Sequence, residues 1–120
     1  MNKILPFNRI DKINSMLFRE LTSLISREPF ERTGEIDILL SLTKVETSRD
    51  LRYAKVFFTV LPEKYRGDAK RFFNSKCQKW QRIIGKKKTF KYTPRLQFFF
   101  DKGQHNAFMV EELLNKIHNV

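Results

Sequence analysis

The chain has 120 residues, of which 41% are hydrophobic and 13% aromatic, with only four Gly and four Pro. This composition excludes a chain that is disordered throughout, and the length suits one core rather than two, so we expect residues 1–120 to form a single domain. The formal net charge of +11 is typical of a protein that binds a polyanion.

The residues that could carry chemistry are few. Cys77 is the sole cysteine, which excludes an internal disulfide, and only His105 and His118 accompany it as soft metal ligands. The sequence has no nucleotide-binding glycine loop and no nucleophile beside a base. We therefore expect no metal, no cofactor, no small-molecule substrate and no catalysis. Residues 1–9 lack the apolar stretch of a signal peptide and no run is long enough to span a membrane, which predicts a cytosolic protein without a membrane partner.

The first predicted element is an amphipathic helix that starts near Ile10. Its apolar residues recur at spacings of three and four, which places them on one face. Asn8 is a candidate N-cap, and Glu28 and Pro29 end the helix because a residue before proline avoids the helical region. The apolar face consists of Ile13, Leu17, Leu21, Leu24 and Ile25.

Two strands are predicted next, over residues 38–46 and 53–61. The second alternates between two sets of side chains, as a strand does. The polar segment 47–50 between them predicts a hairpin turn, in which Ser48 and Asp50 bond to nearby backbone amides. This structural role outweighs a catalytic role for the same residues.

A long helical pattern follows from Glu63 to Ile84, with Gly85 as its expected cap. Because a helix of this length is long for such a domain, we expect it to break or bend near residues 74–78. Trp80 lies in the apolar row of this helix, which favours a core position over base stacking. The same row favours a buried, inert thiol for Cys77.

The remaining pattern predicts a third strand over 96–100, a polar loop over 101–106 and a closing helix over 108–117. One sheet with helices on one face is the simplest architecture for this order, and the helical crossover favours parallel pairing of the second and third strands. The phenylalanine runs at 57–58 and 98–100 predict strands that are buried on both faces, with Phe98 and Phe100 in the core.

The charge is concentrated in one segment. Residues 63–95 hold twelve basic and two acidic residues, so ion pairing within the segment cannot neutralise them. A localised basic surface indicates contact with nucleic acid through backbone and shape, with affinity that depends steeply on salt. The predicted RNA-binding residues are Lys70, Arg71, Lys76, Lys79, Arg82, Lys86, Lys87, Lys88 and Lys91.

Residues 45–56 resemble the ribosome-binding factor A family, whose members carry a valine, a serine, an aspartate–leucine pair and an alanine–lysine–valine triplet in this order. A later segment also resembles the family, whose members carry a proline, a leucine and an aromatic–aspartate ending. The matching residues are Thr93-Pro94-Arg95-Leu96, followed by Phe98, Phe100 and Asp101. Glu111–Leu114 and the opening helix fit as well, so the resemblance covers nearly the whole chain. The motif residues, structural or binding, are Ser48, Asp50, Leu51, Ala54, Lys55 and Pro94.

The resemblance implies a type II KH-like α+β fold: a helix, two strands, two helices separated by a kink, a third strand, and a C-terminal helix, with helices on one face of a three-stranded sheet. It also implies the absence of the glycine-rich loop with which ordinary KH modules clamp nucleic acid, and this chain lacks that loop too. The alanine-x-glycine tripeptide at the family's kink falls on Lys76-Cys77-Gln78 here. Without that glycine, either the kink forms by another route or the two helices run continuously.

The function that the resemblance implies is maturation of the small (30S) ribosomal subunit. Such a factor binds free or immature small subunits and 16S rRNA near its 5′-terminal helix, aids late assembly and rRNA processing, and matters most in the cold. We expect it to act as a monomer. The alternatives are a stable ribosomal protein or hibernation factor and, from another class, a DNA-binding regulator.

Overall fold

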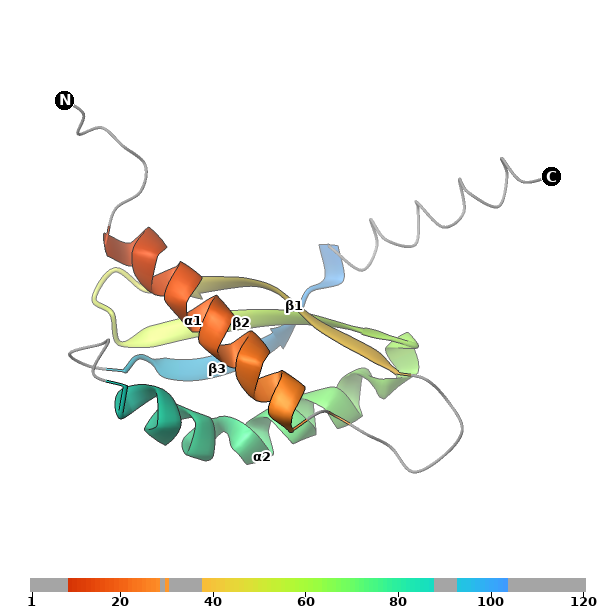
Figure 1. Cartoon of the computed structure of the whole chain (residues 1–120). Coiled ribbons are helices and arrows are strands. Elements are labelled where there is room, and N and C mark those ends of the chain that lie inside the picture. The colour runs from red at the N-terminus through yellow and green to blue at the C-terminus, as the bar shows by residue number, and fades with distance from the viewer. Residues whose placement is uncertain (1–8, 29, 31–37, 88–92, 104–120) are drawn as a thin grey trace.

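The computed structural model describes residues 9–28, 30, 38–87 and 93–103 (Figure 1). The described elements follow the predicted α+β order, and each strand boundary lies within one residue of its predicted position. The expected helix over 108–117 and the cap at Asn8 lie outside the described residues. The elements are α1 (Arg9–Arg27), β1 (Leu39–Thr47), β2 (Tyr53–Leu61), a 3₁₀ turn (Glu63–Tyr65), α2 (Arg66–Gly85) and β3 (Arg95–Phe100).

The three strands form one sheet in the order β1-β2-β3. β1 and β2 pair antiparallel as a hairpin, and β2 and β3 pair parallel, as the helical crossover predicts. A β-bulge between Leu42 and Lys44 shifts the register of β1, so that Val45 pairs with Val56 and faces the core.

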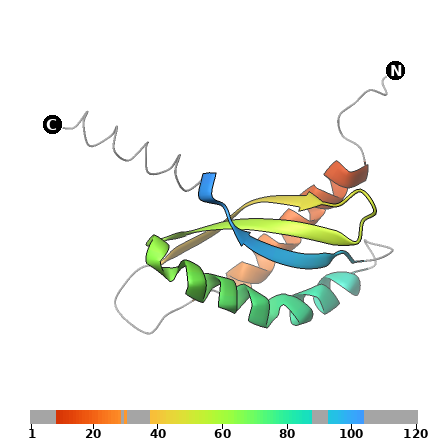
Figure 2. The same ribbon diagram turned by 180° about the vertical axis from the view of Figure 1, so that it is seen from behind.

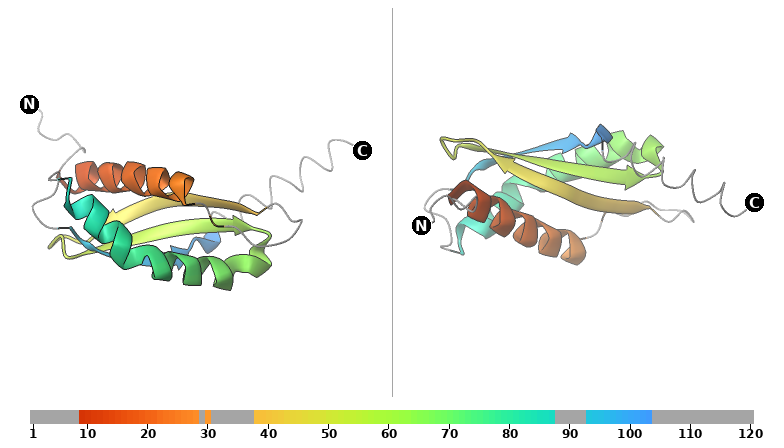
Figure 3. Two further views of the ribbon diagram at one scale, coloured as in Figure 1. Left: turned by 60° about the horizontal axis from the view of Figure 1, so that its bottom comes forward. Right: turned by 90° about the horizontal axis from the view of Figure 1, so that it is seen from above.

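Both described helices cover the same face of the sheet. α1 packs on β1 and α2 packs on β3, and the view from behind shows the three strands in front of α1 (Figure 2). In the right-hand view of Figure 3, the strands lie above α1, on one side of it. The prediction of helices on one face is therefore confirmed for the described elements.

The core forms where the apolar faces of α1 and α2 meet the sheet. Alternate residues of β2 are fully buried, because successive side chains of a strand point to opposite faces. Phe73 of α2 stacks on Phe98 of β3 with ring centroids 4.6 Å apart and also contacts Phe58 at 5.0 Å. Trp80 is fully buried, as its position in the apolar row predicts. The buried hydrophobic residues are Leu17, Leu21, Leu24, Val45, Ala54, Val56, Phe58, Val60, Ala69, Phe73, Trp80, Ile84, Leu96 and Phe98.

The expectation that the strands are buried on both faces is wrong for the described part of the chain. Phe57 is only half-buried, Phe99 is 37% exposed and Tyr53 is 43% exposed. The physical reason is that both described helices pack their apolar faces on one side of the sheet, so no described element covers the other side. We call the side that carries the odd-numbered residues of β2 and β3 the open face of the sheet.

The expected break near residues 74–78 is also wrong, because α2 is one uninterrupted α-helix of 20 residues. Of the two alternatives at Lys76-Cys77-Gln78, the continuous helix is the one observed. Continuity keeps Phe73, Trp80 and Ile84 in phase on one buried stripe, and no residue there has the positive φ that a glycine kink uses. The ribbon of α2 curves along its length instead (Figures 1 and 3).

Gly85 ends α2, but it does not act as the expected left-handed cap. Lys86 follows in right-handed helical geometry with φ −73°, and its N–H donates to the carbonyl of Arg82. A Cβ atom at Gly85 would lie 3.1 Å from Oγ1 of Thr93. The glycine therefore serves a close approach between the end of α2 and the segment that enters β3.

Neighbouring phenylalanines of β3 test which face is buried. Phe98→Ala removes a ring that stacks in the core, and we expect it to lower the free energy of unfolding by about 3–5 kcal/mol in urea titrations. Phe99→Ala removes the contacts of an exposed ring with Phe57 and with Lys70, and it should cost less than about 1 kcal/mol. Equal losses for the two variants would contradict one-sided burial.

Gln78 tests the continuity of α2. Gln78→Gly introduces the glycine of the family's kink at an exposed position, and we expect it to be about 1 kcal/mol less stable than the matched variant Gln78→Ala, because glycine gains the most backbone freedom on unfolding. Urea titration followed by far-ultraviolet circular dichroism measures the difference. A glycine variant as stable as the alanine variant would argue against helical backbone at this position.

Candidate nucleic-acid interface

The basic residues of α2 are divided into groups by helix geometry. Arg71, Arg82 and Lys86 are separated by eleven and four residues, which are near multiples of the 3.6-residue turn, so they form one stripe along the helix. The buried stripe with Phe73 and Trp80 lies on the opposite side. We call Arg71, Arg82 and Lys86 the outward stripe.

The outward stripe is exposed. The Arg71 side chain is 74% exposed and forms an ion pair with Asp68 one helical turn earlier. Arg82 and Lys86 are exposed and make no ion pair with any described residue. Two cations without a fixed anionic partner in this part of the chain are available for phosphate groups.

Lys76 and Lys79 point instead toward the end of α1, where they share one carboxylate. Glu28 Oε1 accepts hydrogen bonds from Lys79 Nζ at 2.8 Å and Lys76 Nζ at 3.2 Å, and Glu28 Oε2 accepts one from Trp80 Nε1 at 3.2 Å. These bonds, led by the one from Lys79, lower the pKa of Glu28 to about 2. The carboxylate thus fixes the end of α1 against the middle of α2 and holds two of the predicted RNA-binding lysines.

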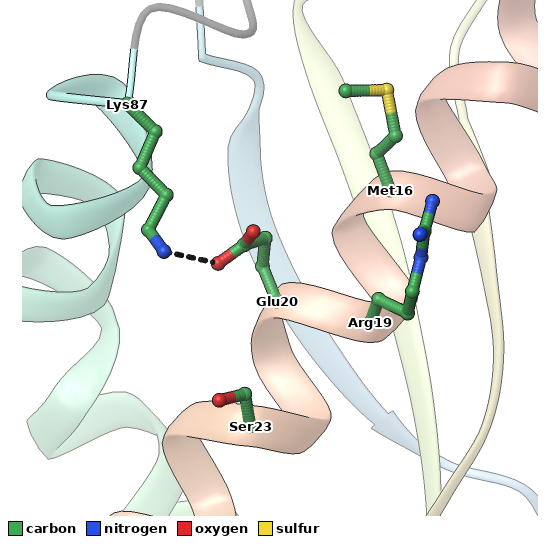
Figure 4. A pocket seen from close by; sticks show the side chains of 5 residues that line it. All are labelled: Met16, Arg19, Glu20, Ser23 and Lys87. Atoms are coloured by element: carbon green, nitrogen blue, oxygen red, sulfur yellow. Dashed lines mark ion pairs between the residues drawn. The ribbon is translucent and has the colours of Figure 1, made fainter.

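Lys87 is paired in a similar way at the far end of α2. Its Nζ lies 3.0 Å from Oε1 of Glu20 on α1, and the pair bridges a groove between the two helices (Figure 4). The groove has a volume of about 370 Å³, and Met16, Arg19 and Ser23 complete its lining. Lys87 is still partly exposed, so it borders both the groove and the solvent.

Lys70 belongs to neither group. Its Nζ lies 5.7 Å from the ring centroid of Phe99, so this side chain reaches the open face of the sheet at the β3 edge. Lys88 and Lys91 lie outside the described residues. Of the described members of the predicted RNA-binding set, the structure therefore brings three together in the outward stripe, pairs three with Glu20 or Glu28, and directs Lys70 to the sheet.

Three of the motif residues organise the hairpin turn. Asp50 Oδ1 accepts hydrogen bonds from the Ser48 hydroxyl at 2.7 Å and from the Arg52 N–H at 3.1 Å, and these bonds lower the pKa of Asp50. The Ser48 hydroxyl oxygen also accepts the N–H of Tyr53 at 3.1 Å. Leu51 has a φ of 62° between them, a conformation that a leucine adopts only when its surroundings impose it. These bonds support the structural role predicted for the turn.

The other motif residues lie on the two faces of the sheet. Ala54 and Pro94 are buried, whereas Lys55 is exposed on the open face. Cys77 is half-buried rather than fully buried, and burial raises the pKa of its thiol. Its Sγ lies 3.3 Å from Gln81 Oε1 and 3.5 Å from the Leu96 carbonyl, which agrees with a protonated, unreactive thiol.

A model of ribosome-binding factor A matches residues 9–114. The chain belongs to the ribosome-binding factor A family. It is 32% identical to ribosome-binding factor A of Protochlamydia amoebophila over 94% of this chain and 86% of that protein. The corresponding protein of Vesicomyosocius okutanii is 35% identical, with coverage of 91% and 92%.

Solved structures of the family share the fold. The Thermotoga maritima ribosome binding factor A structure aligns with a TM-score of 0.67 at 24% identity, covering 83% of this chain and 93% of that one. The crystal structure from Thermus thermophilus aligns with a TM-score of 0.62 at 20% identity, covering 76% and 93%. The three-stranded mixed sheet and its helices are thus the KH-like fold of ribosome-binding factor A, with one continuous helix where the family pattern has a kink.

Within the described residues, no helix is long and apolar enough to cross a membrane, and no three or more His, Cys, Asp or Glu side chains are grouped so as to hold a metal ion. His105 and His118 lie outside this part of the chain.

The sequence patterns did not reveal which acidic residues form ion pairs with the predicted RNA-binding lysines. Glu28 and Glu20 contact lysines that follow them by 48 residues or more in the chain, so no local spacing relates them. The one local signal is the position of Glu28 at the end of a predicted helix, which fits a stop signal equally well. Arg19, which lines the groove, was missed because an isolated arginine on a helix is ordinarily solvated.

Acid titration tests the Glu28 contacts. Because the folded pKa of about 2 is below the ordinary value of 4.5, the contribution of Glu28 to stability is complete above about pH 4.5 and is lost as the pH falls toward 2. We expect Glu28→Gln to be less stable than the parent at pH 7 and to show a smaller loss between pH 4.5 and 2, as measured by urea unfolding across the pH series.

The reciprocal variant controls for this effect. Lys76→Met with Lys79→Met leaves the carboxylate in place but removes the two ammonium groups beside it, so the acid dependence should shrink in the same pH window. Asp50 adds its own acid dependence to every variant, and differences from the parent protein cancel it. Parallel pH curves for the parent and Glu28→Gln would contradict the assigned contacts.

Proposed function

We propose that this chain is a maturation factor of the small (30S) ribosomal subunit that binds free or immature subunits through 16S rRNA. The observation that carries the proposal is the outward stripe of α2, which presents exposed guanidinium and ammonium groups on a rigid helix in a member of the ribosome-binding factor A family. Family membership supports the ribosome as the partner, and the stripe supports RNA as the component that is contacted.

The chemistry of the stripe suits a phosphate backbone. An arginine fork donates two hydrogen bonds to one phosphate, and a lysine supplies a point charge. Along α2, Arg82 and Lys86 are four residues apart and rise about 6 Å, a separation close to that of successive phosphates. No described side chain of the stripe is set in a pocket for a base edge, so recognition rests on RNA shape and charge rather than sequence.

The contacts to α1 complement this surface. Glu28 pairs with Lys76 and Lys79, and Glu20 pairs with Lys87, which restricts the motion of these three ammonium groups. Binding of a phosphate to cations that are already ordered loses less side-chain entropy than binding to mobile lysines. In this scheme the protein is a cytoplasmic monomer that acts by binding and has no catalytic step. It binds near the 5′-terminal helix of 16S rRNA, aids late assembly of the subunit and leaves before translation.

Charge reversal on the outward stripe tests the proposal. We expect Arg82→Glu with Lys86→Glu to weaken binding to free small subunits by about tenfold or more, since each charge-assisted hydrogen bond to a phosphate is worth about 1.5–3 kcal/mol. The slope of log affinity against log salt should fall by about 0.7–0.9 for each phosphate that is no longer neutralised. Sedimentation with small subunits, large subunits and whole ribosomes across a salt series gives both quantities.

The matched control is Arg49→Glu with Lys64→Glu, which makes the same change in net charge at exposed positions off the stripe. This control should bind nearly as the parent protein does. Equal weakening by both double variants would reduce α2 to a nonspecific polyanion surface. Stable sedimentation of the parent with whole, translating ribosomes would favour a ribosomal protein or hibernation factor, and preference for duplex DNA would favour a DNA-binding regulator.

A further inference from the structure

The open face of the sheet carries a row of side chains that α2 does not use for its own packing. Lys44 of β1, Phe57 of β2 and Phe99 of β3 are register partners and lie side by side across the sheet. The two rings are 5.9 Å apart between centroids, and their planes are inclined by 33°. Lys70 reaches the row from α2 at the β3 edge.

Each ring of this row has a cation beside it. Lys44 Nζ lies 4.8 Å from the centroid of Phe57, and Lys70 Nζ lies 5.7 Å from the centroid of Phe99. Lys44 also forms an ion pair with Glu46 at 3.4 Å, and both of these side chains are more than half exposed. The pattern across the sheet is therefore cation, ring, ring, cation.

The open face carries the large apolar side chains that are exposed in the described part of the chain. Of the described residues, the exposed large hydrophobics are Leu39 at 56%, Tyr53 at 43% and Phe99 at 37%, and register places all three on this face. Tyr53 pairs with Arg95, and Lys55 pairs with Gln97, in the neighbouring rows. Folding leaves two rings and a phenol toward solvent on a flat surface, which costs free energy unless a ligand covers it.

We propose that the open face binds a single-stranded segment of RNA by stacking bases on Phe57 and Phe99. A base presents an apolar plane that fits an exposed ring, and its flanking phosphates carry the charge that the neighbouring cations attract. Lys44 and Lys70 border the two rings, and Lys55 and Arg95 extend the positive border toward Tyr53.

Charge decides between RNA and an apolar protein partner. The open-face side chains named above include four cations, Lys44, Lys55, Lys70 and Arg95, and one acid, Glu46. Docking sites for protein are depleted of lysine in their centre, whereas here the ammonium groups lie against the rings themselves. A polyanion with planar groups meets both features at once.

This inference rests on the proposed function only in taking RNA as the ligand, because it assigns a different surface and a different mode of contact. The outward stripe of α2 suits the backbone of folded RNA, and the open face suits unpaired bases. A factor with both surfaces holds a helix and an adjacent unpaired strand at the same time.

Fluorescence anisotropy with a labelled, unstructured RNA of about eight nucleotides tests the inference, since this length is within the usual range of one such surface. The variant Phe57→Leu with Phe99→Leu keeps apolar bulk but removes the stacking planes, and we expect it to bind about tenfold more weakly or worse. Phe57→Tyr with Phe99→Tyr restores the planes and should bind about as tightly as the parent.

Leu39→Ala is the matched control, because it removes an exposed apolar side chain from the same face at the far end of the hairpin. It should bind the RNA as the parent does. Upfield shifts of the Phe57 and Phe99 ring protons on RNA addition give a readout that changes in stability do not imitate. Circular dichroism confirms that each variant is folded.

Three results would overturn the inference: no binding of the single strand by the parent protein, equal binding by the leucine and parent forms, or ring protons that do not shift. If the single strand is not bound but Leu39→Ala and the leucine variant both weaken sedimentation with small subunits, the face is an apolar protein contact instead. The proposed function has its own test: it is contradicted if the parent protein does not sediment with small subunits. That result does not depend on whether the protein binds the single-stranded RNA.

Discussion

The packing of α2 against the sheet is the interaction on which the rest of the structure depends. Phe73 stacks on Phe98 and touches Phe58, while Trp80 and Ile84 continue the same buried stripe. A helix that buries one stripe must expose the opposite one, and in α2 that stripe carries Arg71, Arg82 and Lys86. The hydrophobic contact thereby sets the direction in which the positive charge points.

The same requirement explains why α2 is unbroken. The family pattern places a glycine kink at the position of Gln78, and a kink there would rotate Trp80 and Ile84 out of phase with Phe73. In this chain the helix stays continuous and curves over the sheet (Figure 1). The carboxylate of Glu28 then accepts hydrogen bonds from Lys76, Lys79 and Trp80, so the end of α1 is held against the middle of α2. A groove remains between the helices where Glu20 and Lys87 pair (Figure 4).

Because the described helices cover one side of the sheet, the two proposed RNA contacts fall on two different surfaces. On the helical side, α2 exposes a stripe of positively charged side chains. On the open face, aromatic rings and cations lie in a row across the strands. These surfaces suit different parts of an RNA: a phosphate backbone for the first and unpaired bases for the second. Lys70 connects them, since it belongs to α2 in the chain but lies against Phe99 in space. The proposed maturation factor would use both surfaces on a partly folded rRNA.

The sequence by itself determined the order of the described helices and strands, the hairpin, the parallel pairing, the core role of Trp80 and the segment that carries the charge, because these follow from local periodicity, turn residues and composition. Only the tertiary structure decided which cations are free of acidic partners within the described chain, since Glu20 and Glu28 are far from Lys87 and Lys79 in sequence and meet them through packing. It likewise decided that Phe57 and Phe99 face outward: an apolar run predicts burial on both faces, and whether a second layer exists depends on where the helices go.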